Sequence, residues 1–169
     1  ARLDKDRIGA FADFAVVREG AAALKPSNLD FVQAASLPLV ALTAWQALVD
    51  IGKLRAGQRV LIHAGSGGVG SIAINMLAGR GYEVVAVSGK PEADDYLREL
   101  GASRILRRQE IDLGSKPMER ILWAGAIDNV GGELLTWLTR TVDLWGNIAS
   151  IGLAGSADLN TTVMPFILR

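Results

Sequence analysis

The chain has 169 residues, and its 18 lysines and arginines balance 18 aspartates and glutamates. This balance, with no block of basic residues, argues against nucleic acid or an anionic membrane surface as a partner, and no uninterrupted apolar run reaches the roughly 20 residues of a membrane span. The absence of cysteine excludes disulfides, thiolate nucleophiles and cysteine-containing zinc sites, so we expect a cytoplasmic protein without a metal site.

The first quarter of the chain predicts a strand and then a helix. Residues 10–17 (AFADFAVV) begin with alternation and end as an apolar run, which is typical of a strand. Residues 38–52 carry proline in the first turn and glycine near the end, which predicts a helix. Residues 1–25 precede the regular pattern, and 158–169 (DLNTTVMPFILR) end as though another element were starting. We therefore expect a chain cut from a larger protein.

The remaining residues alternate between strand and helix patterns. Predicted strands occupy 59–63, 82–87, 103–106, 125–130 and 145–152, and predicted helices occupy 68–77, 91–100 and 132–140. Alternation of this kind indicates an α/β fold with a doubly wound parallel sheet and helices on both faces. The expected strand order is 3-2-1-4-5.

The stretch HAGSGGVGS, residues 63–71, contains the pattern G-x-G-x-x-G at Gly65, Gly67 and Gly70. Because it follows a strand and opens a helix, it predicts a Rossmann-type dinucleotide site, with Ser66, Gly68 and Val69 in the same turn. Gly65 would permit a tight turn, Gly67 would admit the pyrophosphate, and Gly70 would let the helix approach the strand. No Gly-Lys-Ser/Thr follows, which excludes a Walker-type site.

The end of the second predicted strand bears on the choice of cofactor. An NAD site usually has Asp or Glu there to bind the ribose 2′-hydroxyl, whereas this chain has Ser88, Gly89 and Lys90. A hydroxyl and an ammonium group suit a 2′-phosphate, and Arg107 or Arg108 could add charge, so the sequence favours NADPH. The alternative is that Lys90 is a solvated loop lysine.

These residues together resemble the zinc-independent branch of the medium-chain dehydrogenase/reductase superfamily. The stretches DRIGAFADFAVV, ALKPSNLDFVQAASLPLVALTAWQALVD and GQRVLIHAGSGGVGS resemble NADPH-dependent quinone oxidoreductases. The stretches SGKPEADDYLRELGASRIL, WAGAIDNVGG and IGLAGSADLNTTVMPFILR are more similar to acryloyl-CoA reductases. A change of subgroup near residues 72–82 would fit either a divergent relative or a recombined chimera.

The resemblance implies a division of the chain and further site positions. It makes 1–25 a remnant of the substrate domain, 26–57 linking helices, 58–155 the NADPH-binding domain and 156–169 a truncated C-terminal segment. It places Thr43 near the nicotinamide, although a threonine on an apolar helix can equally be a core hydroxyl. The other implied contacts, to the nicotinamide ribose and ring, are Asn129, Val130, Gly152, Leu153 and Ala154. A sixth strand is expected after Arg169, and its absence would leave a sheet edge through which copies could associate.

No catalytic residue can be named from the sequence. We expect His63, the single histidine, to be structural, Asp94 and Asp95 to be solvated, and Asp128 to hold either a loop or the cofactor. The predicted function is that of the NADPH-binding domain of an oxidoreductase, which transfers hydride to an activated double bond or a quinone. Two alternatives are a cofactor-binding module and an engineered fragment, both without turnover. S-adenosylmethionine binding ranks last, because it calls for an acid where Ser88 stands.

Overall fold

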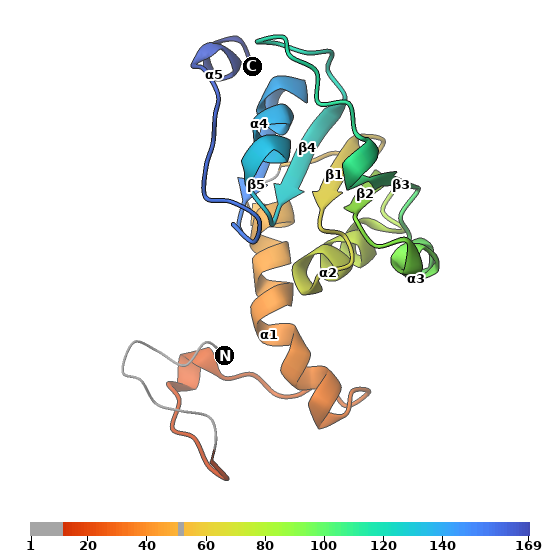
Figure 1. Cartoon of the computed structure of the whole chain (residues 1–169). Coiled ribbons are helices and arrows are strands. Elements are labelled where there is room, and N and C mark those ends of the chain that lie inside the picture. Colours follow the sequence, from red (N-terminus) through yellow and green to blue (C-terminus); the bar gives the residue numbers. More distant parts are fainter. Residues whose placement is uncertain (1–11, 51–52) are drawn as a thin grey trace. The chain divides into compact units, whose positions relative to one another are not determined.

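The computed structural model describes residues 12–50 and 53–169 (Figure 1). The chain divides into two compact units, Ala1–Leu42 and Thr43–Arg169. The division falls inside helix α1 (Phe31–Trp45).

In the first unit, the predicted strand at 10–17 is wrong for the residues that can be assessed. Residues 10 and 11 lie outside the described range, and residues 12–17 form no strand. A strand needs a neighbour whose backbone pairs with its own N–H and C=O groups, and no described strand pairs with this segment. The regular elements here are a 3-10 helix, Glu19–Ala21, and the first part of α1.

Helix α1 begins at Phe31, seven positions before the predicted start. Asp30 accepts a hydrogen bond from the Gln33 N–H at 2.7 Å, and Gln33 Oε1 accepts one from the Asp30 N–H at 3.1 Å. This reciprocal pair is a capping box, which satisfies two of the unpaired N–H groups at a helix start. Pro38 therefore lies inside the helix and not in its first turn. A π-helical turn, Gln46–Asp50, follows, and residues 51–52 are outside the described range.

The apolar helix continues through Pro38. Its apolar stretch is therefore longer than expected from the sequence, where proline was taken to interrupt it. Residues Phe31–Val49 form a helix of 19 residues that is long and apolar enough, by length and composition alone, to cross a membrane. It is the one such helix in the part of the chain that the structure covers. Mostly buried core helices of soluble proteins and signal sequences meet the same criterion, and 17% of the apolar window of this helix is buried.

The second unit contains a five-stranded parallel sheet. Its strands are β1 (Arg59–His63), β2 (Glu83–Ser88), β3 (Arg104–Arg107), β4 (Trp123–Asp128) and β5 (Val142–Ser150). Their order is β3-β2-β1-β4-β5, and every neighbouring pair is parallel. The predicted fold class and strand order are confirmed.

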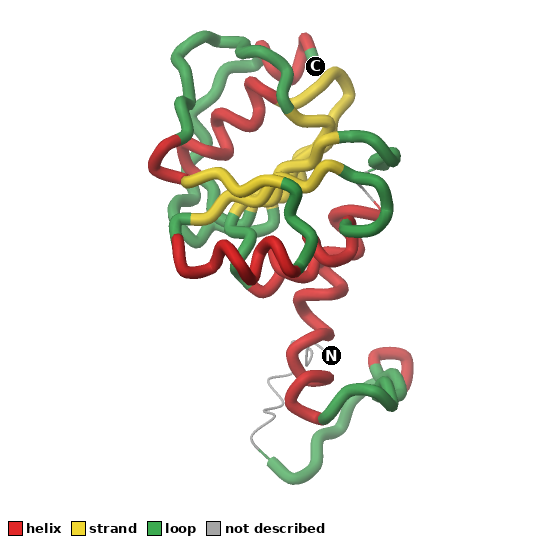
Figure 2. Tube along the Cα trace, turned by 90° about the vertical axis from the view of Figure 1, so that its right-hand side faces the viewer, coloured by secondary structure: helices red, strands yellow, loops and turns green. Residues whose placement is uncertain are grey.

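Helices cover both faces of this sheet (Figure 2). They are α2 (Gly68–Leu77), α3 (Asp94–Glu99) and α4 (Gly132–Thr141), and a short α5 (Met164–Leu168) follows β5. Successive side chains of a strand point to opposite faces of the sheet, so β1 contributes side chains to two hydrophobic cores. Val60 and Ile62 pack in the core that contains α2 and α3, while Leu61 packs in the core that contains α4.

The topology fixes where a ligand site is expected. The chain winds from β1 toward β2 and β3, and then returns to place β4 on the other side of β1. Ligands of open α/β sheets bind at such a switch point, beyond the carboxyl ends of the strands. Strand β5 forms one edge of the sheet, where Leu144 and Trp145 are exposed. Association of copies through this edge stays a prediction.

Candidate functional site

The turn from β1 to α2 is tight because of Ala64, which has a φ of 56°. Gly65 is not among the glycines with a positive φ, so it permits the turn by its small size and not by a left-handed backbone. A Cβ atom on Gly65 would lie 2.9 Å from Ala86 Cβ on β2 and 3.2 Å from Ile74 Cδ1 on α2. Gly65 therefore allows close packing of the turn, and alanine carries the strained backbone.

Gly70 has the packing role that the sequence predicts. A Cβ atom there would lie 2.3 Å from the Ala64 carbonyl oxygen and 2.9 Å from Gly65 Cα. Real Cβ atoms do not approach this closely, so the first turn of α2 can lie against the β1–α2 turn only with glycine at this position.

The start of α2 is open for an anion. Gly67 is the N-cap residue, and no side chain caps the helix there. Gly67 and Gly68 are exposed, Ser66 and Val69 are half-buried, and the first turn contains no acidic residue. The first N–H groups of a helix lack partners within the helix and carry the positive end of its dipole. A pyrophosphate at this position would accept hydrogen bonds from these N–H groups, and no carboxylate in the first turn would repel it.

Beyond β2, Ser88 and Lys90 form a compact turn. The Lys90 N–H donates to Ser88 Oγ at 3.1 Å, and the buried Ser88 hydroxyl donates to the Lys90 carbonyl at 3.4 Å. Gly89 faces Gln109, whose Nε2 would lie 3.1 Å from an added Cβ. The Lys90 side chain is exposed, and among the described residues it forms no ion pair. Its ammonium group is available to an anion.

The two arginines after β3 differ in their surroundings. Arg107 forms an ion pair with Asp94, and its Nη1 donates to the Lys90 carbonyl at 3.4 Å. Asp94, expected to be solvated, thus holds Arg107 against the Ser88–Lys90 turn. Arg108 is exposed, has no ion pair within the described range, and lines a cavity. Of the two, Arg108 is the free cation.

His63 and Asp128 link the ends of β1 and β4. Their side chains are buried, and His63 Nδ1 lies 2.6 Å from Asp128 Oδ1. The Gly131 N–H donates to Asp128 Oδ2 at 2.9 Å, and Asn129 Nδ2 donates to the His63 carbonyl at 2.7 Å. The roles expected for His63 and for Asp128 as a loop-holding residue agree with these contacts.

The turn after β5 lies directly on the turn after β4. The Ala154 N–H donates to the Asn129 carbonyl at 3.4 Å, and the Gly155 N–H donates to the Val130 carbonyl at 2.9 Å. An added Cβ on Gly152 would lie 2.3 Å from the Asn129 carbonyl oxygen, so this contact also requires glycine. The structure thus brings together the predicted residues Asn129, Val130 and 152–154.

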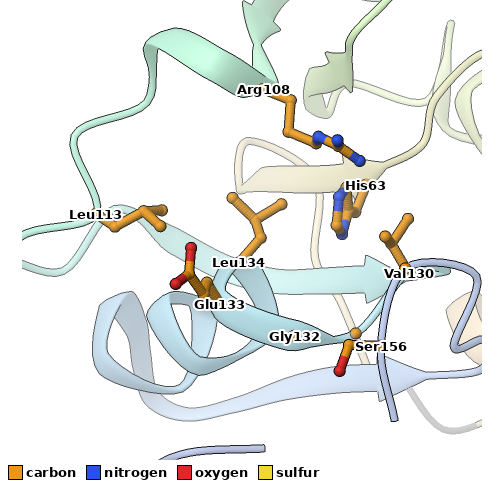
Figure 3. Close-up of a pocket in the computed structure, with 10 residues that line it drawn as sticks. His63, Arg108, Leu113, Val130, Gly132, Glu133, Leu134 and Ser156 are labelled. Carbon is orange, nitrogen blue, oxygen red and sulfur yellow. The ribbon is translucent and has the colours of Figure 1, made fainter. Parts of the chain in front are cut away.

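A cavity of about 320 Å³ opens beside these turns (Figure 3). Its lining comes from the ends of β1 and β4, the first turn of α4, the segment after β3 and the turn after β5: His63, Arg108, Leu113, Val130, Gly131, Gly132, Glu133, Leu134, Gly155 and Ser156. The sequence reasoning missed most of this set. The signal that could have found it is the glycine pair after β4, since Gly131 and Gly132 both have positive φ.

Thr43 is the one predicted site residue that precedes the sheet in the sequence. It lies in α1 and is half-buried, next to Ala44, which belongs to the core formed with α2 and α3. Its approach to a nicotinamide ring stays a prediction.

Comparison with known proteins assigns the family. The model of the family described as zinc-binding dehydrogenase matches residues 68–169. The chain belongs to this family. Within the described ranges, no group of three or more His, Cys, Asp or Glu residues could hold a metal ion, despite the family's description.

Two individual relatives show the extent of the likeness. The chain is 40% identical to acrylyl-CoA reductase AcuI of Ruegeria pomeroyi over 99% of its own length and 52% of that protein. It is 41% identical, with a TM-score of 0.78, to the yhdH oxidoreductase of Salmonella enterica solved in complex with NADP, covering 87% of this chain and 46% of the other. The chain thus spans about half the length of the relatives it matches.

A third relative was solved with a different cofactor. The Bacillus subtilis protein yhfP, solved with NAD bound, is 38% identical with a TM-score of 0.77 over 87% of this chain and 46% of that protein. These comparisons confirm the predicted superfamily. AcuI matches both halves of the chain, so the change of subgroup near 72–82 stays a prediction.

Proposed function

We propose that this chain binds NADPH along the carboxyl edge of its sheet and is the nucleotide-binding half of a reductase. The observation that carries the proposal is the end of β2. No carboxylate stands where an NAD site places one, and the free ammonium of Lys90 lies in a turn braced by Ser88 and Arg107. A 2′-phosphate would find the positive charge of Lys90 there.

The residues present fit the rest of the cofactor. Gly70 lets the first turn of α2 lie against the β1–α2 turn, and the uncapped start of α2 offers N–H groups for the pyrophosphate. Asn129 and Val130 with residues 152–154 form the far end of the same edge, where the nicotinamide half would lie. When bound, NADPH supplies the hydride, while the chain's own residues fix its position and exclude water from it.

The proposed reaction is hydride transfer to an electron-poor double bond in a small thioester substrate, with a quinone as the second candidate acceptor. The name of the AcuI relative supports the first class. When hydride adds to one carbon of the double bond, negative charge develops on the other carbon and on the conjugated thioester carbonyl. The protein must stabilise this developing charge. This chain covers about half of the length of the relatives, and no residue for that role is identified among its described residues.

Lys90→Ala tests whether the ammonium group of Lys90 contacts the 2′-phosphate. We expect it to weaken NADPH binding about tenfold, because one charge-assisted hydrogen bond to the 2′-phosphate is lost, and to leave NADH binding unchanged. Fluorescence titration with both cofactors measures this, and Lys116→Ala, an exposed lysine in the segment between β3 and β4, is the matched control. Equal weakening of both cofactors would contradict a 2′-phosphate contact at Lys90.

The location of the protein in the cell and the kind of partner it binds are two further predictions. The cytoplasmic location remains a prediction, since the relatives include bacterial enzymes and proteins named as mitochondrial. We expect neither nucleic acid nor a membrane as a partner, and a small-molecule substrate agrees with the enzymes to which the chain is similar.

A further inference from the structure

A cavity of about 500 Å³ lies at the amino edge of the sheet, away from the proposed nucleotide site. Three of its lining residues are the first residues of their strands: Arg59 of β1, Arg104 of β3 and Trp123 of β4. The cofactor is assigned to the opposite, carboxyl edge of these parallel strands. Arg107 lines the cavity too, but its guanidinium pairs with Asp94 on α3. We call this space the amino-edge cavity.

The connection from β3 to β4 explains why this part of the sheet is open. Residues 108–122 contain one 3-10 turn, Arg108–Glu110, and no α-helix. A crossover between parallel strands usually supplies a helix that covers the sheet. Here the apolar side chains of Leu106, Ile111 and Leu122 form part of the cavity wall, and they belong to the core that contains α4. The volume they leave is typical of small-molecule sites.

Trp123 brings a buried hydrogen-bond donor to this cavity. The residue is 4% exposed, and its Nε1 has no hydrogen-bond partner in the part of the chain described. Its ring packs edge-on against Trp137, with centroids 5.8 Å apart. An indole N–H only donates, and most buried donors of native proteins have an acceptor. A ligand with an acceptor group would supply one.

A cation lies beside Trp123 on the neighbouring strand. Val60 pairs with Gly125, so Arg59 and Trp123 both lie at the start of adjacent strands. Arg59 Nε contacts Glu83 Oε2 at 2.8 Å, and both side chains of this pair are exposed. An exposed pair is weak, and Arg59 forms no other ion pair within the described ranges. Its Nη groups are therefore available to a second carboxylate.

The β3 side of the cavity does not favour an anion. Arg104 shares that side with Glu110 and Asp112. Asp112 Oδ1 already accepts a hydrogen bond from the Gly114 N–H at 2.9 Å. The two acids repel a negative group there, so the anionic end of a ligand belongs at the β1 and β4 side.

We propose that the amino-edge cavity is a second binding site, which takes a small carboxylate with an aromatic body. The carboxylate accepts hydrogen bonds from Trp123 Nε1 and from the Nη groups of Arg59. The aromatic body packs against Trp137 and the apolar wall of the cavity. This site goes beyond the proposed NADPH site and does not depend on it.

The test compares naphthoate with its neutral counterpart naphthamide by calorimetric titration of the unaltered chain. Naphthoate should bind with a Kd below about 1 mM, and naphthamide about tenfold more weakly, because the ionised acceptor is lost. Saturating NADPH should leave the affinity for naphthoate unchanged, since the two sites lie at opposite edges of the sheet.

Two variants test the proposed contacts. Trp123→Phe keeps an aromatic ring but removes the N–H donor, and Arg59→Gln removes the cation. Each should weaken naphthoate binding about tenfold. The matched controls are Trp145→Phe and Arg55→Gln, both at exposed positions outside the cavity lining, and they should leave the affinity unchanged.

A further measurement does not depend on a variant that folds. The chain has four tryptophans, and resonance assignment of the unaltered chain identifies the indole N–H signal of each. Naphthoate should move the Trp123 signal downfield as its hydrogen bond forms. The signals of Trp45 and Trp145, which are exposed, should stay in place.

The proposal would be overturned if the folded chain did not bind naphthoate, or bound naphthoate and naphthamide equally. An unmoved Trp123 signal, or displacement of naphthoate by NADPH, would also overturn it. Failure to bind NADPH would instead overturn the proposed function and leave the naphthoate result standing, so the two failures are distinguishable.

Discussion

Gly70→Ala should abolish NADPH binding and lower the free energy of unfolding by about 2 kcal/mol. The new Cβ would lie 2.3 Å from the Ala64 carbonyl oxygen, and both the β1–α2 turn and the first turn of α2 would have to move apart. Overpacking of this kind costs about 3 kcal/mol, and the better helix propensity of alanine returns about 1 kcal/mol. Urea denaturation and a cofactor titration measure the two effects.

Gly20→Ala is the control for this variant, because an added Cβ there meets nothing within 4 Å. It should change the free energy of unfolding by less than about 0.5 kcal/mol. A Gly70→Ala chain with unchanged stability and cofactor affinity would show that the turn is looser than the structure has it.

Asp128→Ala should be the most destabilising single change at the strand ends, with a loss of about 3 kcal/mol in the free energy of unfolding. The variant removes the partner of the buried His63 Nδ1 and of the Gly131 N–H together. It also frees the turn after β4 against which 152–154 lie, so NADPH affinity should fall with stability. Denaturation with urea and calorimetric titration measure the two quantities.

Asp95→Ala is the control for Asp128→Ala, because it removes a carboxylate that takes no part in the contact between the ends of β1 and β4. The Asp95 side chain is 93% exposed and pairs with Arg98 three residues further along α3. An exposed pair of this kind contributes about 0.5 kcal/mol. If Asp128→Ala cost no more than Asp95→Ala, the contact between the ends of β1 and β4 would not be a stabilising feature.

The part of the fold that depends on local pattern could be predicted from the sequence. Residues 59–63 have an apolar centre, Val60 to Ile62, between turn signals, and they form β1 with the predicted bounds. The same holds for 68–77, which form α2. The strand order followed from the dinucleotide-binding pattern of the first turn between strand and helix, which is typical of the order 3-2-1-4-5.

The start of α1 was readable but was missed. Asp30 and Gln33 have the spacing of a capping box, whereas the prediction relied on Pro38 as a start signal. The strand expected at 10–17 failed for a different reason, because strand pattern alone does not supply the neighbour that a strand needs.

The site was predictable wherever a residue acts by its own chemistry or backbone, as at Gly70 and Lys90. It was not predictable where the role comes from a distant partner. Asp94 on α3 holds Arg107 on β3, and this pairing depends on the fold. The positive φ at Ala64 could not be predicted either, because alanine is not a residue type that favours this conformation. The cavity beside α4 needs the turns after β1, β4 and β5 to meet, which no local pattern specifies.

The central claim is that the chain binds NADPH with a contact to its 2′-phosphate. Calorimetric titration of the folded 169-residue chain with NADPH and with NADH tests it most directly. We predict that NADPH binds at least about tenfold more tightly, as expected for the added charge-assisted hydrogen bonds. Equal affinities, tighter binding of NADH, or no binding of either cofactor by the folded chain would contradict the claim.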